Sequence, residues 1–309
     1  MDSAVPGHQE AATPFSELEA SHVRAVWEPL GLPGLIDVHT HFMPRSVMDK
    51  VWAYFDSAGP LLGREWPITY RADEDVRAAA LQSFGVRAYS SLVYPHKPDM
   101  AEWLNGWATD FAAHHPDCLH TATFYPEESA PGYVAAAIEA GARVFKCHIQ
   151  VGDYSALDPL LDGVWSQLAD AQVPVIIHCG SGPAPGTYTG PVPIIKLLKR
   201  FPSLPLIIAH MGTPEYDEFL TLAERYEHVH LDTTMSFTDF SEESAPYPPE
   251  LRPRLRDAGP KILFGSDFPN IPYTYTHALE AIVRLDLGDD WLRGVFYGNA
   301  ARLFGPASR

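Results

Sequence analysis

The chain has 309 residues and carries 39 Asp and Glu against 22 Lys and Arg, a formal charge of −17 at pH 7. A surface this acidic repels phosphate backbones and anionic lipid, so we expect neither nucleic acid nor a membrane surface as a partner. The hydrophobic fraction of 46% and charged fraction of 20% are typical of a globular chain and exclude disorder for most of it.

The first 33 residues precede the first predicted strand. They contain no basic start followed by an apolar stretch, so we expect no signal peptide and a cytoplasmic location. The three scattered cysteines are too few for a disulfide framework, which agrees with a reducing compartment. We expect residues 15–30 to form a helix outside the domain, with 1–33 an N-terminal extension and 34–309 a single domain.

Short apolar runs alternate with stretches of helical spacing along the rest of the chain. Runs such as PVIIHC are apolar along their whole length, which is typical of parallel strands buried on both faces. The predicted strands are 35–38, 86–93, 119–124, 143–147, 173–177, 206–209, 229–231 and 262–265. The predicted helices are 100–114, 133–140, 159–171, 193–201, 215–226, 249–257 and 275–285. Eight strand-helix units predict an α/β fold, a (β/α)₈ TIM-like barrel, with an open doubly wound sheet as the alternative.

Two connections, residues 42–75 and 233–249, are too long to be simple turns. Both follow strands, so in a barrel they would cover the catalytic face as long loops. The alternative is that they are disordered surface insertions.

Histidines and one aspartate fall at the ends of predicted strands. The carboxyl ends of barrel strands meet on one face, where such barrels keep their chemistry. The residues concerned are His39, His41, His148, His178, His210 and Asp267.

His39 and His41 are two residues apart, and residues two apart in a strand point to the same side. Both imidazoles can then bind one ion, and His178 and Asp267 at other strand ends complete a candidate metal site. Three histidines and a carboxylate suit one zinc ion, with manganese or iron as alternatives. The competing interpretation is that these histidines are packing or capping residues.

The motifs IDVHTHFMP, FKCH, PVIIHCG, LIIAHMGTP, LFGSDFP and YGNAARLFG, in this order, resemble the amidohydrolase superfamily. Within it they are similar to the amidohydrolase-related branch that includes aminocarboxymuconate semialdehyde decarboxylase and hydroxybenzoate decarboxylases. The resemblance implies a TIM-like barrel with His39, His41, His178 and Asp267 as metal ligands. It also implies that His210 lies beside the metal as a base or polarising group.

Further residues are candidates for substrate binding. We expect Lys146 to be an unmodified cation near the substrate; the alternatives are a carbamylated lysine bridging two metals and a simple strand-end charge. His148 lies on the same side of its strand and is a candidate for substrate contact or for support of the site. Arg45, Arg64 and His96 follow the first two strands and could clamp a carboxylate.

The function expected from this set is hydrolysis of a small carboxylate-bearing lactone, enol or amide by a metal-activated water. Asp267 would transfer the proton and His210 would polarise the carbonyl. A non-oxidative decarboxylase or hydratase on the same residues is the close alternative, and a non-catalytic binding protein is the remote one. The expected partner is a small organic acid, and a homo-oligomer is possible.

Overall fold

The computed structural model describes residues 13–305, and parallel strands form its centre. They pair in the orders β1-β2-β3 and β4-β5-β6-β7-β8-β9. The backbone N–H of Val38 donates to the carbonyl of Phe264 at 2.9 Å and joins the last strand to the first. The strands are β1 (Leu35–Asp37), β2 (Val86–Ser90), β3 (Cys118–Leu119), β4 (Thr121–Thr123), β5 (Val144–His148), β6 (Val175–His178), β7 (Leu206–Ile208), β8 (Val229–Asp232) and β9 (Ile262–Leu263).

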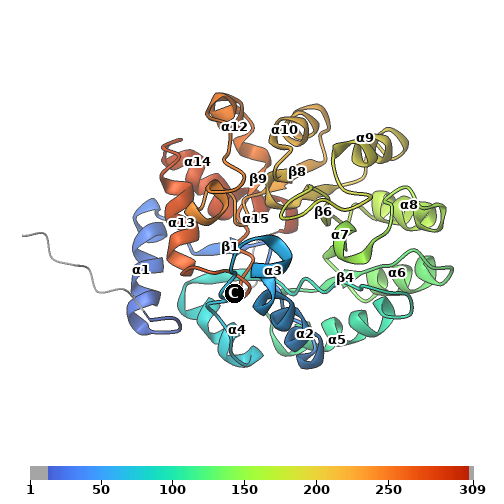
Figure 1. Cartoon of the computed structure of the whole chain (residues 1–309), viewed down its shortest axis with the longest axis horizontal. Helices are drawn as coiled ribbons and strands as arrows, with labels where there is room; N and C mark the ends of the chain where they lie inside the picture. Colours follow the sequence, from blue (N-terminus) through green and yellow to red (C-terminus); the bar gives the residue numbers. More distant parts are fainter. Residues whose placement is uncertain (1–12, 306–309) are drawn as a thin grey trace, which may run out of the picture.

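The third predicted strand is divided at His120 into β3, which pairs with β2, and β4, which pairs with β5. Counting these two pieces as one strand gives eight, and helices surround them as a ring (Figure 1). The predicted (β/α)₈ barrel is therefore confirmed.

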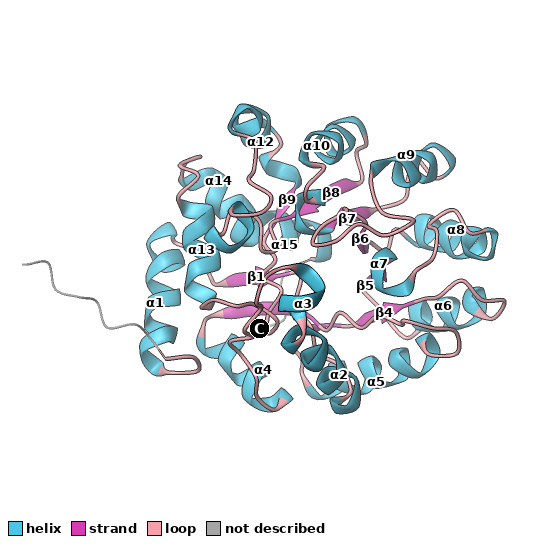
Figure 2. Cartoon of the chain, viewed as in Figure 1, coloured by secondary structure: helices cyan, strands magenta, loops and turns pink. Residues whose placement is uncertain are grey.

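The helices form the outer layer around the strands (Figure 2). In α9, Pro191 occupies the first turn, where no N–H is needed, and Ile194, Leu197 and Leu198 are buried at helical spacing. The helices are α1 (Glu17–Trp27), α2 (Arg45–Asp56), α3 (Ala58–Leu62), α4 (Glu74–Ser83), α5 (Ala101–His114), α6 (Ala130–Glu139), α7 (Ile149–Gly152), α8 (Asp162–Ala171), α9 (Pro191–Arg200), α10 (Tyr216–Arg225), α11 (Asp239–Glu242), α12 (Arg252–Asp257), α13 (Tyr275–Val283), α14 (Asp289–Arg293) and α15 (Asn299–Phe304). Within residues 13–305, none of the helices is long and apolar enough to cross a membrane.

The connection 42–75, predicted as a long loop, is largely helical. It contains α2 and α3, and α2 buries Met48 and Trp52, which lie one turn apart. The second connection, 233–249, contains the short α11. Residues of both connections line the cavity described below, so their expected place over the catalytic face is confirmed.

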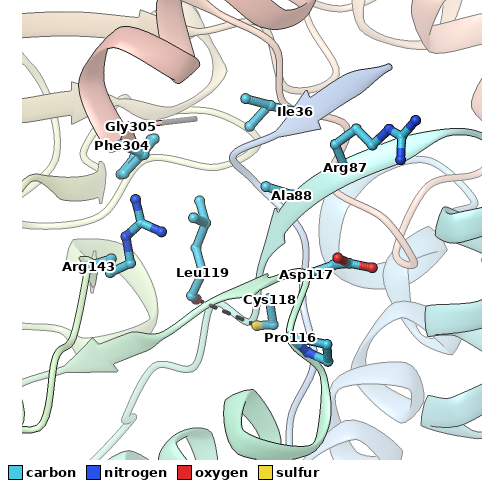
Figure 3. Close-up of a pocket in the computed structure, with 10 residues that line it drawn as sticks. All are labelled: Ile36, Arg87, Ala88, Pro116, Asp117, Cys118, Leu119, Arg143, Phe304 and Gly305. Atoms are coloured by element: carbon cyan, nitrogen blue, oxygen red, sulfur yellow. Dashed lines mark hydrogen bonds between the residues drawn. The ribbon is translucent and has the colours of Figure 1, made fainter. Parts of the chain in front are cut away.

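The barrel interior is filled with apolar side chains below the site, including Ile36, Val144, Ile176 and Ile207. At the amino-terminal end of the strands there is a small hollow beside Phe304 (Figure 3). Its volume of about 20 Å³ has room for a single water. This hollow is therefore too small for an organic ligand.

The N-terminal helix α1 packs outside the barrel against α13 and α4, as expected for residues 15–30. The indole Nε1 of Trp27 donates to the carbonyl of Phe84 at 2.9 Å. Gly85 has a φ of +84° and lies so close to this indole that a Cβ would be 2.3 Å from it. The extension is thus fitted to the barrel by side-chain packing.

Glu19 on α1 provides a test of this packing. Its side chain is buried, accepts the N–H of Phe15 at 2.8 Å, and contacts the hydroxyl of Tyr70. Burial raises the pKa of Glu19 above its ordinary value of 4.5, although the hydrogen bond from Tyr70 opposes the shift. A raised folded pKa means that the protonated carboxyl favours folding, and this contribution is lost as the pH rises through that pKa.

The wild type loses this contribution as the pH rises, and Glu19→Gln does not. We therefore expect the free energy of unfolding of Glu19→Gln, relative to that of the wild type, to increase from about pH 4 to about pH 7. Urea denaturation at both pH values measures the difference in free energy of unfolding. Glu17→Gln, at an exposed position of the same helix, controls for the loss of one negative charge. A constant difference between the wild type and Glu19→Gln would contradict the expectation.

Candidate metal centre

Three buried residues at the carboxyl end of the barrel bring potential ligand atoms within 4.8 Å of one another: His39, His41 and Asp267. The Oδ1 of Asp267 lies 3.0 Å from Nε2 of His41 and 3.6 Å from Nε2 of His39. The backbone holds this arrangement, because the N–H of Asp267 donates to the carbonyl of His39 at 2.9 Å. The expected inward orientation of both histidines after β1 is what the structure shows.

The hydrogen bonds of the rings determine which nitrogen is free. The Nδ1 of His41 lies 2.8 Å from the carbonyl of Leu92, which can only accept, so Nδ1 carries the proton. In the neutral ring Nε2 is then an acceptor facing the carboxylate of Asp267, and two acceptors at 3.0 Å need a cation between them. His39 likewise has its Nδ1 at 2.9 Å from Oδ2 of Asp232.

Two further histidines follow the same pattern. The Nε2 of His178 lies 3.0 Å from the carbonyl of Gly182, which leaves Nδ1 as its lone-pair nitrogen. The Nδ1 of His210 lies 3.1 Å from the carbonyl of Thr234, which leaves Nε2. In its neutral form each of the four rings keeps one lone pair, and with the carboxylate of Asp267 this donor set fits a divalent transition metal.

His178 stands slightly apart from the other expected ligands, since its atoms lie outside the three-residue cluster. Its ring stacks on His148 with centroids 4.2 Å apart, and its centroid is 4.6 Å from that of His210. The Nδ1 of His148 accepts the N–H of Val151 at 3.3 Å, so its own proton is on Nε2.

Asp232 at the end of β8 connects the metal cluster to His210. One carboxylate oxygen contacts His39, and the other accepts the backbone N–H groups of His210 at 2.8 Å and Thr234 at 3.1 Å. His210 has a φ of +56°, a left-handed conformation that is uncommon for residues other than glycine. A single buried carboxylate therefore orients both a candidate ligand and the candidate base. The sequence analysis missed Asp232, although it ends a strand as the other site residues do.

The electrostatics of the site follow from burial and crowding. Burial opposes ionisation of Asp267, yet its interactions with His41 and the neighbouring histidines hold its pKa well below its usual range. Burial lowers the pKa of His210 to about 4 and that of Lys146 to about 8. The Nζ of Lys146 is fully buried, 3.1 Å from Nε2 of His39.

A cavity of about 1170 Å³ opens above these residues. Its upper wall is largely apolar and aromatic, with residues from α2, the two long connections and the segment after β2. Tyr94 is a second residue that the sequence analysis missed: its ring contacts both His41 and His148, with centroid distances of 5.5 and 4.9 Å. The wall includes Val47, Val51, Phe55, Trp66, Tyr94, Met100, Trp103 and Phe240.

The expected substrate-binding residues divide into two groups. Lys146, His148, Arg64 and His96 line the cavity. The guanidinium of Arg64 is already engaged, 3.4 Å from the ring centroid of Phe240 and 2.8 Å from a carboxylate oxygen of Glu243.

Arg45 is not among the lining residues. Its exposed side chain forms ion pairs with Asp49 at 2.8 Å and Asp73 at 2.5 Å, so the structure does not bring it to the other candidates. Because Arg45 begins α2, the direction of its side chain depends on how that helix packs, which the sequence pattern did not specify.

Comparison with known proteins agrees with this geometry. The model of the amidohydrolase family matches residues 36–305, so the chain belongs to this family, as the resemblance in the sequence indicated. Members of this metal-dependent superfamily are enzymes, and the chain is one of them. No curated protein matches the sequence.

Several solved structures share the fold. An uncharacterised TIM-barrel protein from Bordetella bronchiseptica has a TM-score of 0.71 at 19% identity, over 89% of this chain and 100% of that one. A 5-carboxyvanillate decarboxylase from Sphingomonas paucimobilis has a TM-score of 0.61 at 15% sequence identity, and the match covers 88% of this chain and 99% of that one. A probable 2-pyrone-4,6-dicarboxylic acid hydrolase from Acinetobacter baumannii has a TM-score of 0.57 at 15% sequence identity, and the match covers 88% of this chain and 99% of that one.

Proposed function

We propose that this enzyme is a metal-dependent hydrolase of a small cyclic compound that carries a carboxylate, such as a lactone. The observation that supports it most is the arrangement of His39, His41 and Asp267 on the floor of a large, aromatic-walled cavity. An apolar wall with a few convergent polar groups is typical of small-molecule sites.

His39, His41 and Asp267, with His178 as a fourth residue, would hold one divalent cation, with zinc as the first expectation and manganese or iron as alternatives. When bound, the cation supplies Lewis acidity, which lowers the pKa of water and polarises a carbonyl. A solved structure of a decarboxylase of this fold from Novosphingobium aromaticivorans contains manganese.

His210 is the proton acceptor in this proposal. Its Nδ1 proton is held by the carbonyl of Thr234, so the neutral ring presents an unprotonated Nε2 and has no proton with which to polarise a carbonyl. This geometry favours the role of base over the polarising role considered from the sequence. His210 would take the proton from the water that attacks the carbonyl carbon and, as the carbon–oxygen bond of the lactone breaks, return it to the leaving oxygen. Asp267, to which the sequence analysis gave the proton transfer, would help to hold the cation with His39 and His41.

A decarboxylase is the second candidate. Lys146 places a buried ammonium beside His39, where it would hold the carboxylate of a bound acid. Decarboxylases of this fold are among the solved structures similar to the chain.

Elemental analysis of the purified protein, followed by turnover of a panel of lactones and hydroxybenzoates, distinguishes the hydrolase from the decarboxylase. Lactone opening without release of carbon dioxide supports the hydrolase, and carbon dioxide release supports the alternative.

Lys146 provides a second prediction. If its ammonium binds substrate, Lys146→Met should raise KM about tenfold or more and leave metal stoichiometry near one per chain, because the ligands are other residues. Methionine keeps the apolar stem of the buried side chain. Two metals per native chain, falling in the variant and partly restored by short carboxylic acids, would instead demonstrate a bridging carbamate.

A further inference from the structure

The cavity reverses the charge balance of the chain. Its lining contains four Lys and Arg side chains against two Asp side chains, whereas the whole chain has 22 against 39. Of the two acids, Asp267 belongs to the metal cluster. Because Arg64 is paired with Glu243, three lysines remain against Asp99, and the cavity carries a local positive charge that would attract anions. The lining residues counted are Lys50, Arg64, Lys97, Lys146, Asp99 and Asp267.

Two of these lysines and a neighbouring histidine gather at the mouth of the cavity and form what we call the cationic rim: Lys50, Lys97 and His96. Lys50 lies on α2, and His96 and Lys97 lie on the segment that follows β2. All three are exposed and line the cavity. The charges of Lys97 and Lys50 reinforce the effect of burial in lowering the pKa of His96, so these groups interact.

Within the part of the chain that the structure describes, the rim side chains have no ion-pair partner, a property that they share with Lys199 on α9 but not with several exposed arginines. Exposed arginines such as Arg71 and Arg254 form ion pairs with neighbouring carboxylates. Among residues 13–305, no ion pair or hydrogen bond involves the side chain of Lys50, His96 or Lys97. In so acidic a protein, three neighbouring basic groups without a carboxylate partner leave a place for an external anion.

A second positive group lies on the floor, where Lys146 is buried beside His39. Between floor and rim the wall is apolar, with Tyr94, Met100 and Trp103 among its residues. A ligand that satisfies all three regions has an acidic group at each end and a ring between them.

We propose that the cationic rim is a distal carboxylate subsite, so that the substrate is a ring compound with a second acidic group remote from the metal centre. This inference rests on the proposed function for the floor of the cavity. The ammonium groups of Lys50 and Lys97 attract the distal carboxylate, and the imidazole of His96 donates a hydrogen bond to it.

Direct binding measurements on the metal-loaded enzyme test the proposal without requiring turnover. The probes are two matched pairs, benzoate with benzene-1,4-dicarboxylate and biphenyl-4-carboxylate with biphenyl-4,4′-dicarboxylate, which differ in the distance between acids. In at least one pair the dicarboxylate should bind about tenfold more tightly than its partner at low salt. In the double variant Lys50→Gln/Lys97→Gln this preference should fall to about unity, while binding of the monocarboxylate changes little.

Lys199→Gln is the matched control, since Lys199 is an exposed lysine on α9 that does not line the cavity. It should keep the preference for the dicarboxylate. Equal affinities within both pairs, absence of binding by all four probes, or a preference that survives in the double variant would overturn the proposal. If dicarboxylates are preferred but no lactone is opened, the subsite stands and the hydrolase assignment fails.

Discussion

Replacement of His41 by alanine is expected to abolish metal binding and activity together while the barrel stays folded. The ring nitrogen Nε2 lies 3.0 Å from Oδ1 of Asp267, and its loss removes one of three clustered candidate ligands. We expect metal affinity to fall by more than about 100-fold, because even residues that only support a ligand contribute about 10- to 100-fold. Chelator competition measures the affinity, and elemental analysis measures the stoichiometry.

Two further variants make this experiment specific. His178→Ala should also weaken metal binding if Nδ1 of that ring is the fourth ligand. Asp232→Asn leaves one acceptor oxygen where two are used, and if that oxygen keeps the backbone N–H groups of His210 and Thr234, the amide NH₂ faces the Nδ1 proton of His39. This change should cost about 10- to 100-fold in metal affinity. Full metal occupancy in His41→Ala, with an unchanged urea midpoint, would remove His41 from the ligand set.

The place of the site could be predicted from the sequence, because the carboxyl ends of barrel strands meet on one face. The structure ends β1 at Asp37, so His39 and His41 lie just beyond the strand. They converge with Asp267 as expected, although the two-residue period of a strand does not apply to them. The same rule of strand ends applied to Asp232 would have identified it, but a single carboxylate in a run such as HLDTT is not distinctive without a partner. Its partners, His39 and the backbone of His210, are distant in sequence.

The cavity wall could not be predicted in the same way. It depends on α2, which lies in a segment with Pro44 and Gly63 at its borders that predicts a loop. The direction of each side chain on α2 follows from the packing of Met48 and Trp52 into the protein. This packing turns Val47, Lys50 and Val51 toward the cavity and leaves Arg45 with Asp49 and Asp73. Long-range packing of this kind is not encoded in local spacing.

Replacement of His210 is expected to separate catalysis from metal binding. Asparagine is the appropriate variant because it tolerates the left-handed backbone at φ +56° better than alanine. It keeps the backbone N–H that Asp232 accepts but has no basic nitrogen in place of Nε2. We expect His210→Asn to retain close to full metal content and to lose about 10² to 10⁴ in kcat, the usual contribution of a positioned proton-transfer group.

A second variant distinguishes a base from a structural role. Glycine also adopts the left-handed conformation without strain and leaves space where the imidazole was. Added imidazole should therefore restore part of kcat in His210→Gly, with a dependence on pH that follows the free base, and should not change the wild type. Loss of metal together with activity in both variants would show that His210 is a ligand. If His210→Gly retains metal but has low activity that imidazole does not restore, His210 has a structural role, through the contact of its Nδ1 with the carbonyl of Thr234. Added imidazole can replace a transferred proton but not this contact.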